Sequence, residues 1–405
     1  MSRRVLTCTV FLLTQAVAYG EDFALAGPYA PGWLETTVTR PNKSRFQSLL
    51  YYPAKAPGQN AVFEPNGAPY PGIAFGHGYL TAPDKYRSTL AHLASRGYLV
   101  MAPRSGGELF PSHRDFAGDL SHCLTWLVGQ NANISSFLCG KVNTEMFGLS
   151  GHSMGGGCSI LAAAADDRVK AVVNLAAANT NPSAIAAMIS VRAPVSLIAG
   201  TQDAIVPVGS HGQLMYLNGA TPRQLPLILG GCHCGFLDSP MIFCDSGSIS
   251  GSQQLSTTRH LLTAFFELNL KKRQSSWSQV WGQAVLEDPR WSIELDAGCL
   301  LTPNRVERTG RPGTETSVIL TLTNLSPYAD QYDLFVEGNQ WPTATSITRT
   351  GPLDPGASVD LVVHVVFPSE YAPRGDTAVV SARSGRDGAT RTFARIESHI
   401  VVPGG

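Results

Sequence analysis

The sequence predicts an α/β protein, with a mainly parallel sheet covered by helices on both faces, followed by an all-β module. Up to Asp296, short apolar runs that suit buried strands alternate with helical stretches, which is typical of a parallel sheet. From Asn304 onward helical periodicity disappears, and short strand-like runs alternate with turns. The 405 residues include 30 basic and 30 acidic side chains, so the charge does not favour nucleic acid or an anionic membrane surface as a partner.

The start of the chain has the composition of a signal peptide. Arg3 and Arg4 are followed by an apolar run over 5–17 and by the small residues Ala18 and Gly20. This run is shorter than the roughly 20 residues that a membrane-spanning helix needs. We therefore expect residues 1–20 to be a signal peptide and the mature protein to be secreted or periplasmic, without a transmembrane segment.

The alternating part of the sequence defines its strands and helices in order. Each predicted strand is a short apolar run, and these runs cover 49–52, 71–75, 98–101, 145–149, 171–175, 195–200 and 226–229. Helices are expected over 88–95, 115–128, 158–165 and 256–270. The last helix has an apolar stripe that would pack on the sheet, formed by Leu261, Leu262, Phe265, Phe266 and Leu270. No large insertion separates the strands at 175 and 195, which favours an open site over one covered by a lid.

A G-x-S-x-G motif over 151–155 places Ser153 between a predicted strand and a predicted helix. A sharp turn between strand and helix lifts a serine hydroxyl above the sheet. Glycines are needed at both flanks because a side chain there would collide with the neighbouring strand and helix. The motif in this context predicts that Ser153 is a nucleophile.

A serine nucleophile needs a base, and the base needs a carboxylate that orients it. In this arrangement the chain order is serine, acid, histidine, with both partners following later strands. Asp203 follows the strand at 195–200, and His233 follows the strand at 226–229, which makes them the candidates. The alternative interpretation of Asp203 is a turn carboxylate or helix cap before Pro207.

Attack by a serine nucleophile also needs two backbone N–H groups that stabilise the oxyanion. Met154 follows the serine and would give one of them. Tyr79 lies in a glycine-containing loop after the strand at 71–75, and its N–H would give the second.

These motifs together resemble the α/β-hydrolase superfamily. The G-H-S-M-G-G run around Ser153, the Asp203–Val208 stretch and His233 resemble the branch that contains dienelactone hydrolases, bacterial cutinases, polyester (PET) hydrolases, chlorophyllases and platelet-activating-factor acetylhydrolases. The resemblance covers roughly residues 45–285. It implies that Tyr79, Met154 and Ile205 line the acyl-binding cleft. Residues 176–182 contain no counterpart of the cleft tryptophan of the polyester hydrolases, and position 200, where such enzymes can carry a pairing cysteine, is glycine.

From the triad and the resemblance we expect a secreted serine esterase that hydrolyses carboxylic esters of short or medium chain, or polyesters, without a cofactor or metal. The catalytic domain is expected to cover 21–295. Its inserted loop after His233 could edge the cleft through Phe236, Met241 and Phe243. One alternative is a serine peptidase or amidase of the same superfamily. The other is a non-catalytic adhesion or binding protein on a hydrolase scaffold.

Seven cysteines lie beyond the predicted signal peptide. Cys158 is expected to be a buried free thiol, and Cys123 is expected to pair with Cys139 across the end of a helix. The pairing among the remaining four stays open: Cys232, Cys234, Cys244 and Cys299. In an extended loop the side chains of residues 232 and 234 would lie opposite His233, and two bridges there would lock the base. A zinc site at this Cys-His-Cys string is disfavoured because adjacent residues rarely close around one ion.

The C-terminal region, 300–403, is predicted to be an immunoglobulin-like β-sandwich. Its strand-like runs are regularly spaced between turn signals, and they cover 317–322, 331–336, 359–365 and 378–382. Trp341 is expected in the core of this sandwich, with a ligand-stacking platform as the alternative. The module could dock the enzyme on a polymer, a partner or a cell surface.

Overall fold

A computed structural model describes residues 21–239, 241–326, 328–369, 374–386, 388 and 390–401. The predicted signal peptide, residues 1–20, lies outside the described residues. Ten strands of the described chain form one sheet in the order β10-β9-β8-β7-β6-β4-β5-β2-β1-β3. Their bounds are β1 (Ala30–Thr39), β2 (Arg45–Ala54), β3 (Gly58–Gln59), β4 (Tyr70–Gly76), β5 (Leu99–Pro103), β6 (Val142–His152), β7 (Val169–Leu175), β8 (Val195–Gly200), β9 (Arg223–Ile228) and β10 (Trp291–Asp296).

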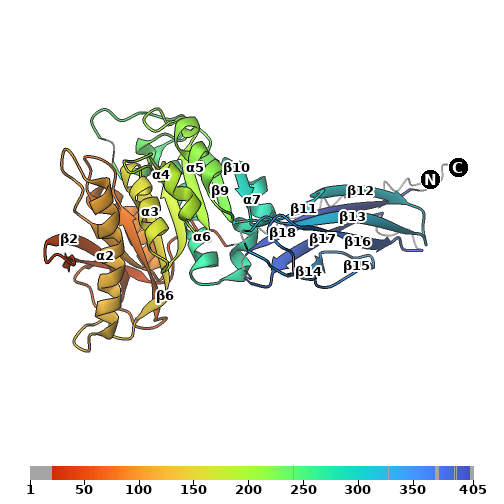
Figure 1. Cartoon of the computed structure of the whole chain (residues 1–405), viewed down its shortest axis with the longest axis horizontal. Helices are drawn as coiled ribbons and strands as arrows, with labels where there is room; N and C mark the ends of the chain where they lie inside the picture. The colour runs from red at the N-terminus through yellow and green to blue at the C-terminus, as the bar shows by residue number, and fades with distance from the viewer. Residues whose placement is uncertain are drawn as a thin grey trace, which may run out of the picture.

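The middle of this sheet is parallel, from β5 through β4, β6, β7 and β8 to β9, and antiparallel strands extend it at both edges. Two separate hydrophobic clusters cover its two faces. One cluster contains side chains from α2 and α3, and the other contains side chains from α1 and α6. Helices therefore pack on both faces of the sheet, as the sequence predicts (Figure 1). The helices are α1 (Arg87–Ser95), α2 (His113–Ala132), α3 (Met154–Ala165), α4 (Ala184–Ala187), α5 (Gly212–Asn218), α6 (Gly251–Asn269) and α7 (Gln283–Glu287).

The outer strands β1 and β10 were not expected from the sequence. Both are only partly buried, because β10 lies at the edge of the sheet and β1 has only the two-residue β3 on its outer side. Their sequences therefore lack the continuous apolar run of the central strands. Helix α6 begins five residues earlier than predicted, where Ser250 and Gln253 form a reciprocal capping box. The strands that carry the site lie where they were predicted, and α3, which follows Ser153, begins at Met154, four residues before the helix predicted over 158–165.

The rest of the described chain is all-β. It forms two four-stranded sheets, β11-β13-β16-β15 and β12-β18-β17-β14. Their bounds are β11 (Cys299–Thr302), β12 (Arg305–Gly310), β13 (Glu315–Asn324), β14 (Tyr332–Glu337), β15 (Thr343–Thr345), β16 (Ser358–Val366), β17 (Gly375–Ser384) and β18 (Arg391–Ile400). Trp341 is 2% exposed and its ring lies 5.5 Å from that of Phe367 in the hydrophobic core of this part, so its interpretation as a core residue is confirmed.

The two parts are closely connected. Only two residues, Ala297 and Gly298, separate β10 of the large sheet from β11 of the small one. Contacts also cross between them: the rings of Trp277 and Phe393 lie 5.7 Å apart, and Arg395 lies 3.3 Å from Glu287. Figure 1 shows the small sheets extending away from the helical part.

The expected bridge between Cys123 and Cys139 is wrong, since both are free thiols. Cys123 faces the core from the inner side of α2, with its Sγ 3.9 Å from the hydroxyl of Ser48. Helix α2 continues to Ala132, about 14 Å further along its axis. The N–H of Gly140 donates to the carbonyl of Asn131 at 3.0 Å, which holds the neighbouring Cys139 at this end of the helix, too far from Cys123 for a disulfide. Cys158 is a buried free thiol, as expected.

No helix in the described part of the chain is long and apolar enough to cross a membrane.

Candidate active site

Ser153 lies at a strained turn between β6 and α3. Its backbone has φ 56° and ψ −120°, a conformation that a residue with a side chain rarely adopts without a functional reason. A Cβ atom on Gly151 would lie 2.4 Å from the carbonyl oxygen of Gly155, and one on Gly155 would lie 2.2 Å from that of Gly76. Both flanking positions therefore need glycine, as the motif predicts.

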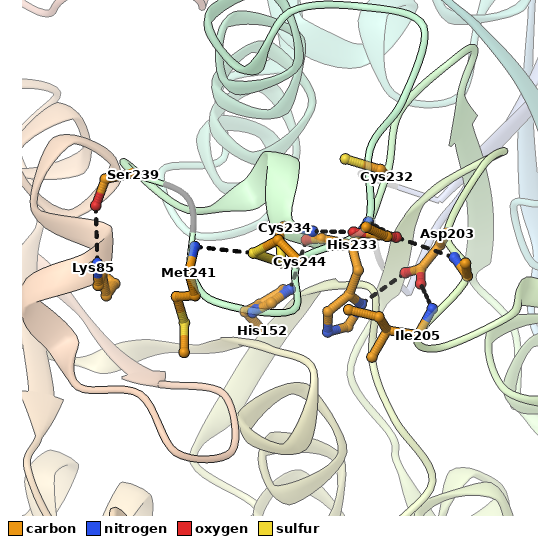
Figure 2. The surroundings of a disulfide bond; sticks show 12 residues. Lys85, His152, Asp203, Ile205, Cys232, His233, Cys234, Ser239, Met241 and Cys244 are labelled. Atoms are coloured by element: carbon orange, nitrogen blue, oxygen red, sulfur yellow. Dashed lines mark hydrogen bonds and ion pairs between the residues drawn. A yellow bond between two sulfur atoms is a disulfide. The ribbon is translucent and has the colours of Figure 1, made fainter.

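Asp203 and His233 lie in the loops after β8 and β9, at the same edge of the sheet as Ser153. Nδ1 of His233 donates to Oδ2 of Asp203 at 2.8 Å (Figure 2). Both side chains are buried, which strengthens this charge-assisted bond. Since Nδ1 carries the proton, Nε2 of the neutral ring is an acceptor.

Asp203 also acts as a turn cap, which was the alternative interpretation of this residue. Its Oδ1 accepts the N–H groups of Ile205 at 3.0 Å and Val206 at 2.7 Å. The carboxylate therefore caps the following turn with one oxygen and holds His233 with the other. The two interpretations are compatible because each uses its own oxygen.

A chain of hydrogen bonds connects the loop of Tyr79 to His233. The N–H of Gly78 donates to the hydroxyl of Tyr86 at 3.1 Å, and that hydroxyl bonds Nδ1 of His152 at 2.8 Å. Nε2 of His152 lies 3.2 Å from the main-chain oxygen of His233, and because a carbonyl only accepts, Nε2 must carry the proton. Burial and the neighbouring His233 hold the pKa of His152 well below its usual range, so this ring is neutral. His152 is a variable position of the G-x-S-x-G motif, so the motif did not predict this role.

The backbone donors expected for the oxyanion belong to residues near Ser153: Met154 follows it, and Tyr79 follows Gly78, where a Cβ atom would lie 3.5 Å from that of Ser153. Met154 is the first residue of α3, so its N–H is among those that the helix itself leaves unpaired. In the described part of the chain neither this N–H nor that of Tyr79 donates a hydrogen bond. The side chain of Tyr79 is held by its hydroxyl, which donates to the carbonyl of Leu109 at 2.7 Å.

Of the four residues expected to line the cleft, Tyr79 and Ile205 lie at the surface, 44% and 47% exposed. Met154 is buried. Phe236 does not reach the surface: it is fully buried, and its ring lies 5.6 Å from that of His152. The expectation that Phe236 edges the cleft is corrected, because residues 234–236 form a 3₁₀ turn that directs the ring into the core.

The loop after His233 is closed by one disulfide, between Cys234 and Cys244 (Figure 2). Cys232 and Cys299 are free, so of the pairings that the sequence left open only this one is formed in the described residues. The loop is also not extended at His233, whose φ of −61° and ψ of −53° are helical, so residues 232 and 234 do not share one side. With Cys234 in a disulfide, the Cys-His-Cys string does not offer two thiolates to a metal.

Asp245, next to this disulfide, is a site residue that the sequence reasoning missed. Its Oδ2 accepts the N–H groups of His233 at 2.9 Å and Ala204 at 3.1 Å, and its Oδ1 accepts that of Cys234 at 3.0 Å. No motif marks this position, which is twelve residues after His233 in an irregular insertion. Its place directly after a cysteine of uncertain pairing was the available signal.

The parallel sheet, the serine turn before α3 and the Asp203–His233 pair define an α/β-hydrolase. Residues 24–233, just over half of the chain, match the PET hydrolase-like family, and the chain belongs to this family. It is 26% identical to the bis(hydroxyethyl) terephthalate hydrolase of Streptomyces coelicolor over 199 residues. The matched region covers 48% of this chain and 56% of that protein. It is 32% identical to Chlorophyllase-2 of Arabidopsis thaliana over 89 residues, a region that covers 22% of this chain and 27% of that protein. The chain thus spans about half the length of the first relative and about a quarter of the second.

Proposed function

We propose that this protein is a serine esterase that hydrolyses carboxylic esters through an acyl-enzyme. The oxygen of Ser153 attacks the ester carbonyl, and Nε2 of His233 takes the serine proton. The N–H groups of Tyr79 and Met154 stabilise the resulting oxyanion. His233 then gives the proton to the leaving alcohol, and water, activated by the same imidazole, releases the acid and restores Ser153.

The observation that carries this proposal is the 2.8 Å bond between Asp203 and His233 at the sheet edge where the strained turn presents Ser153. This bond fixes the tautomer that leaves Nε2 as the base. Structural ion pairs can also form such a bond, but they do not require a neighbouring serine with φ 56° between two glycines that cannot carry a side chain.

The substrate class follows from the surroundings of the serine and from the relatives. Tyr79 and Ile205 give the site an apolar, exposed rim, which suits an acyl group or an aromatic ester. One relative is named a bis(hydroxyethyl) terephthalate hydrolase and the other a chlorophyllase. We propose carboxylic esters of short or medium chain, or polyesters, as the substrates.

Hydrolysis of a p-nitrophenyl ester series from acetate to palmitate tests the function. The wild type should release p-nitrophenol, and Ser153→Ala should lose nearly all of this activity while unfolding at the same temperature. Asp203→Asn should lower kcat by about 10³- to 10⁴-fold, because the amide favours the wrong tautomer of His233. A folded wild-type protein without activity on any ester, or a Ser153→Ala variant as active as the wild type, would contradict the proposal.

We further propose that residues 1–20 direct export, that 21–295 form the catalytic domain and that 300–403 are an immunoglobulin-like module. The two four-stranded sheets, antiparallel except for the parallel β12–β18 pair, and their shared core support the last of these. The module would dock the enzyme on a polymer or a cell surface. Comparing the binding of full-length protein and of an active-site variant to insoluble polyester and to cell walls would test the docking function.

A further inference from the structure

Side chains bond the N–H groups of residues 232–234 and the carbonyl groups of residues 232 and 233. Gln254 on α6 forms two bonds with Cys232, donating to its carbonyl at 2.7 Å and accepting its N–H at 3.0 Å. His152 donates to the carbonyl of His233. Asp245 accepts the N–H groups of His233 and Cys234. Of these three side chains, Asp245 alone also bonds the loop that carries Asp203, through the N–H of Ala204.

Close to the sheet, main-chain contacts already hold the two loops together. The N–H of Gln202 donates to the carbonyl of Gly231 at 2.8 Å. Gly200 and Gly231 are so close that a Cβ atom on Gly200 would lie 2.4 Å from the carbonyl carbon of Gly231. Position 200 therefore cannot carry a side chain that would connect the loop of Asp203 with the loop of His233. Beyond this point, the bond between Asp203 and His233 needs another contact to hold its partners in register, and Asp245 makes that contact.

We propose that Asp245 is a positioning residue for the esterase reaction: its carboxylate sets the distance and angle between Asp203 and the imidazole of His233. The proposal rests on the proposed function of these two residues. Asp245 touches neither of their side chains by hydrogen bonds and acts through the main chain of His233, Cys234 and Ala204. The disulfide contributes by fixing Cys244, the residue before Asp245, beside Cys234.

A carboxylate suits this position better than a neutral side chain. It has two oxygens that only accept, so it can serve three N–H donors at once, and bonds to a charged acceptor are stronger than neutral ones. Burial favours the neutral acid, but the N–H groups of Cys234, His233 and Ala204 outweigh it and hold the pKa of Asp245 below its usual range. Asp245 therefore stays ionised at neutral pH.

The test compares Asp245→Ala with Asp245→Asn and a matched control, Asp238→Ala. Asp238 belongs to the same inserted loop and also accepts a backbone N–H, that of Ser88 at 2.8 Å, but it bonds α1 instead of His233. We would measure kcat and KM on a soluble p-nitrophenyl ester, the unfolding temperature, and the downfield proton resonance of His233 Nδ1–H. That resonance reports the bond to Asp203 without any substrate.

For Asp245→Ala we expect kcat to fall by about 10- to 100-fold with KM little changed, because the loss is one of alignment. The Nδ1–H resonance should shift or broaden. Asp245→Asn should be intermediate, since one oxygen can still accept two of the three N–H groups. Asp238→Ala should keep both the resonance and kcat.

An Asp245→Ala protein that keeps kcat and the resonance while its unfolding temperature falls would overturn the proposal, leaving Asp245 as a stabiliser of the loop. If Asp245→Ala does not fold, an unchanged resonance and kcat in Asp245→Asn would overturn it equally. A wild type without esterase activity would contradict the proposed function, whereas the resonance would still decide whether Asp245 aligns the pair.

Discussion

The imidazole rings of His152 and His233 lie 4.5 Å apart, and Nε2 of His152 donates to the main-chain oxygen of His233. The same His152 accepts the hydroxyl of Tyr86, which in turn accepts the N–H of Gly78 next to Tyr79. One neutral, buried imidazole thus connects the loop of the predicted oxyanion donor with the loop of the predicted base.

Replacing His152 by leucine should remove both of its hydrogen bonds. The buried hydroxyl of Tyr86 and the carbonyl of His233 would lose a partner, at a cost of about 1–3 kcal/mol each when no water replaces it. We expect a lower unfolding midpoint in urea together with a fall in kcat. His152→Gln, which keeps a donor and an acceptor, should lose less of both. Equal effects of the two substitutions would show that packing alone matters here.

Adding one methyl group at Gly155 should destabilise the protein. Its Cβ would lie 2.2 Å from the carbonyl oxygen of Gly76, so the turn after Ser153 has to shift, and overpacking of this kind costs about 1–3 kcal/mol or more. Urea unfolding of Gly155→Ala measures the loss. Gly129→Ala is the matched control, because nothing lies within 4 Å of its Cβ and α2 should gain up to about 1 kcal/mol of helix propensity.

Reducing the Cys234–Cys244 disulfide should lower activity before it unfolds the protein. The bridge closes a short loop with a sequence separation of 10, worth about 3 kcal/mol in the chain-entropy model, and it lies beside His233. Ester hydrolysis and circular dichroism, followed together during thiol treatment, should separate the two events. A Cys234→Ala, Cys244→Ala double variant should start at the lower activity and not respond to the thiol. Full activity after complete reduction, verified by thiol counting, would contradict this.

Stability should fall in mild acid because of buried histidines. Burial and the charges of Arg259 and Arg96 lower the pKa of His92 from 6.5 to about 4. Below pH 6.5 the unfolded chain therefore binds a proton that the folded protein refuses until about pH 4, so stability decreases as the pH falls through this window, by about 1.4 kcal/mol per pH unit. Above pH 6.5 this contribution is constant.

The control is His92→Gln, whose amide can still bond the hydroxyl of Thr263, the partner of His92 at 3.1 Å. Its free energy of unfolding, measured in urea between pH 4 and 7, should have a shallower slope than that of the wild type. Identical slopes would assign the acid sensitivity to the other buried histidines, among them His152.

The central strands, the main helices and the positions of Ser153, Asp203 and His233 could be predicted because each follows from a local rule. A run of apolar residues indicates a buried strand, and strand ends bring loop residues to one edge. Asp245 and the Cys234–Cys244 pairing could not be predicted in this way. They depend on how an irregular insertion folds back on itself, and nothing in its Ser- and Gly-rich sequence fixes that path. The prediction for Phe236 was wrong for the same reason, because the 3₁₀ turn that begins at Cys234 directs its ring into the core instead of toward the cleft.

The two-residue connection between β10 and β11 determines how the C-terminal module can work. A long flexible linker would let a binding module anchor to a surface while the enzyme sweeps the area around it. Here the Trp277–Phe393 and Glu287–Arg395 contacts add to the short connection in holding the β-sheets against the hydrolase part. If the module docks the protein as we propose, these contacts would hold Ser153 at one fixed orientation to the bound surface, and only the part of that surface near the module would come within its range.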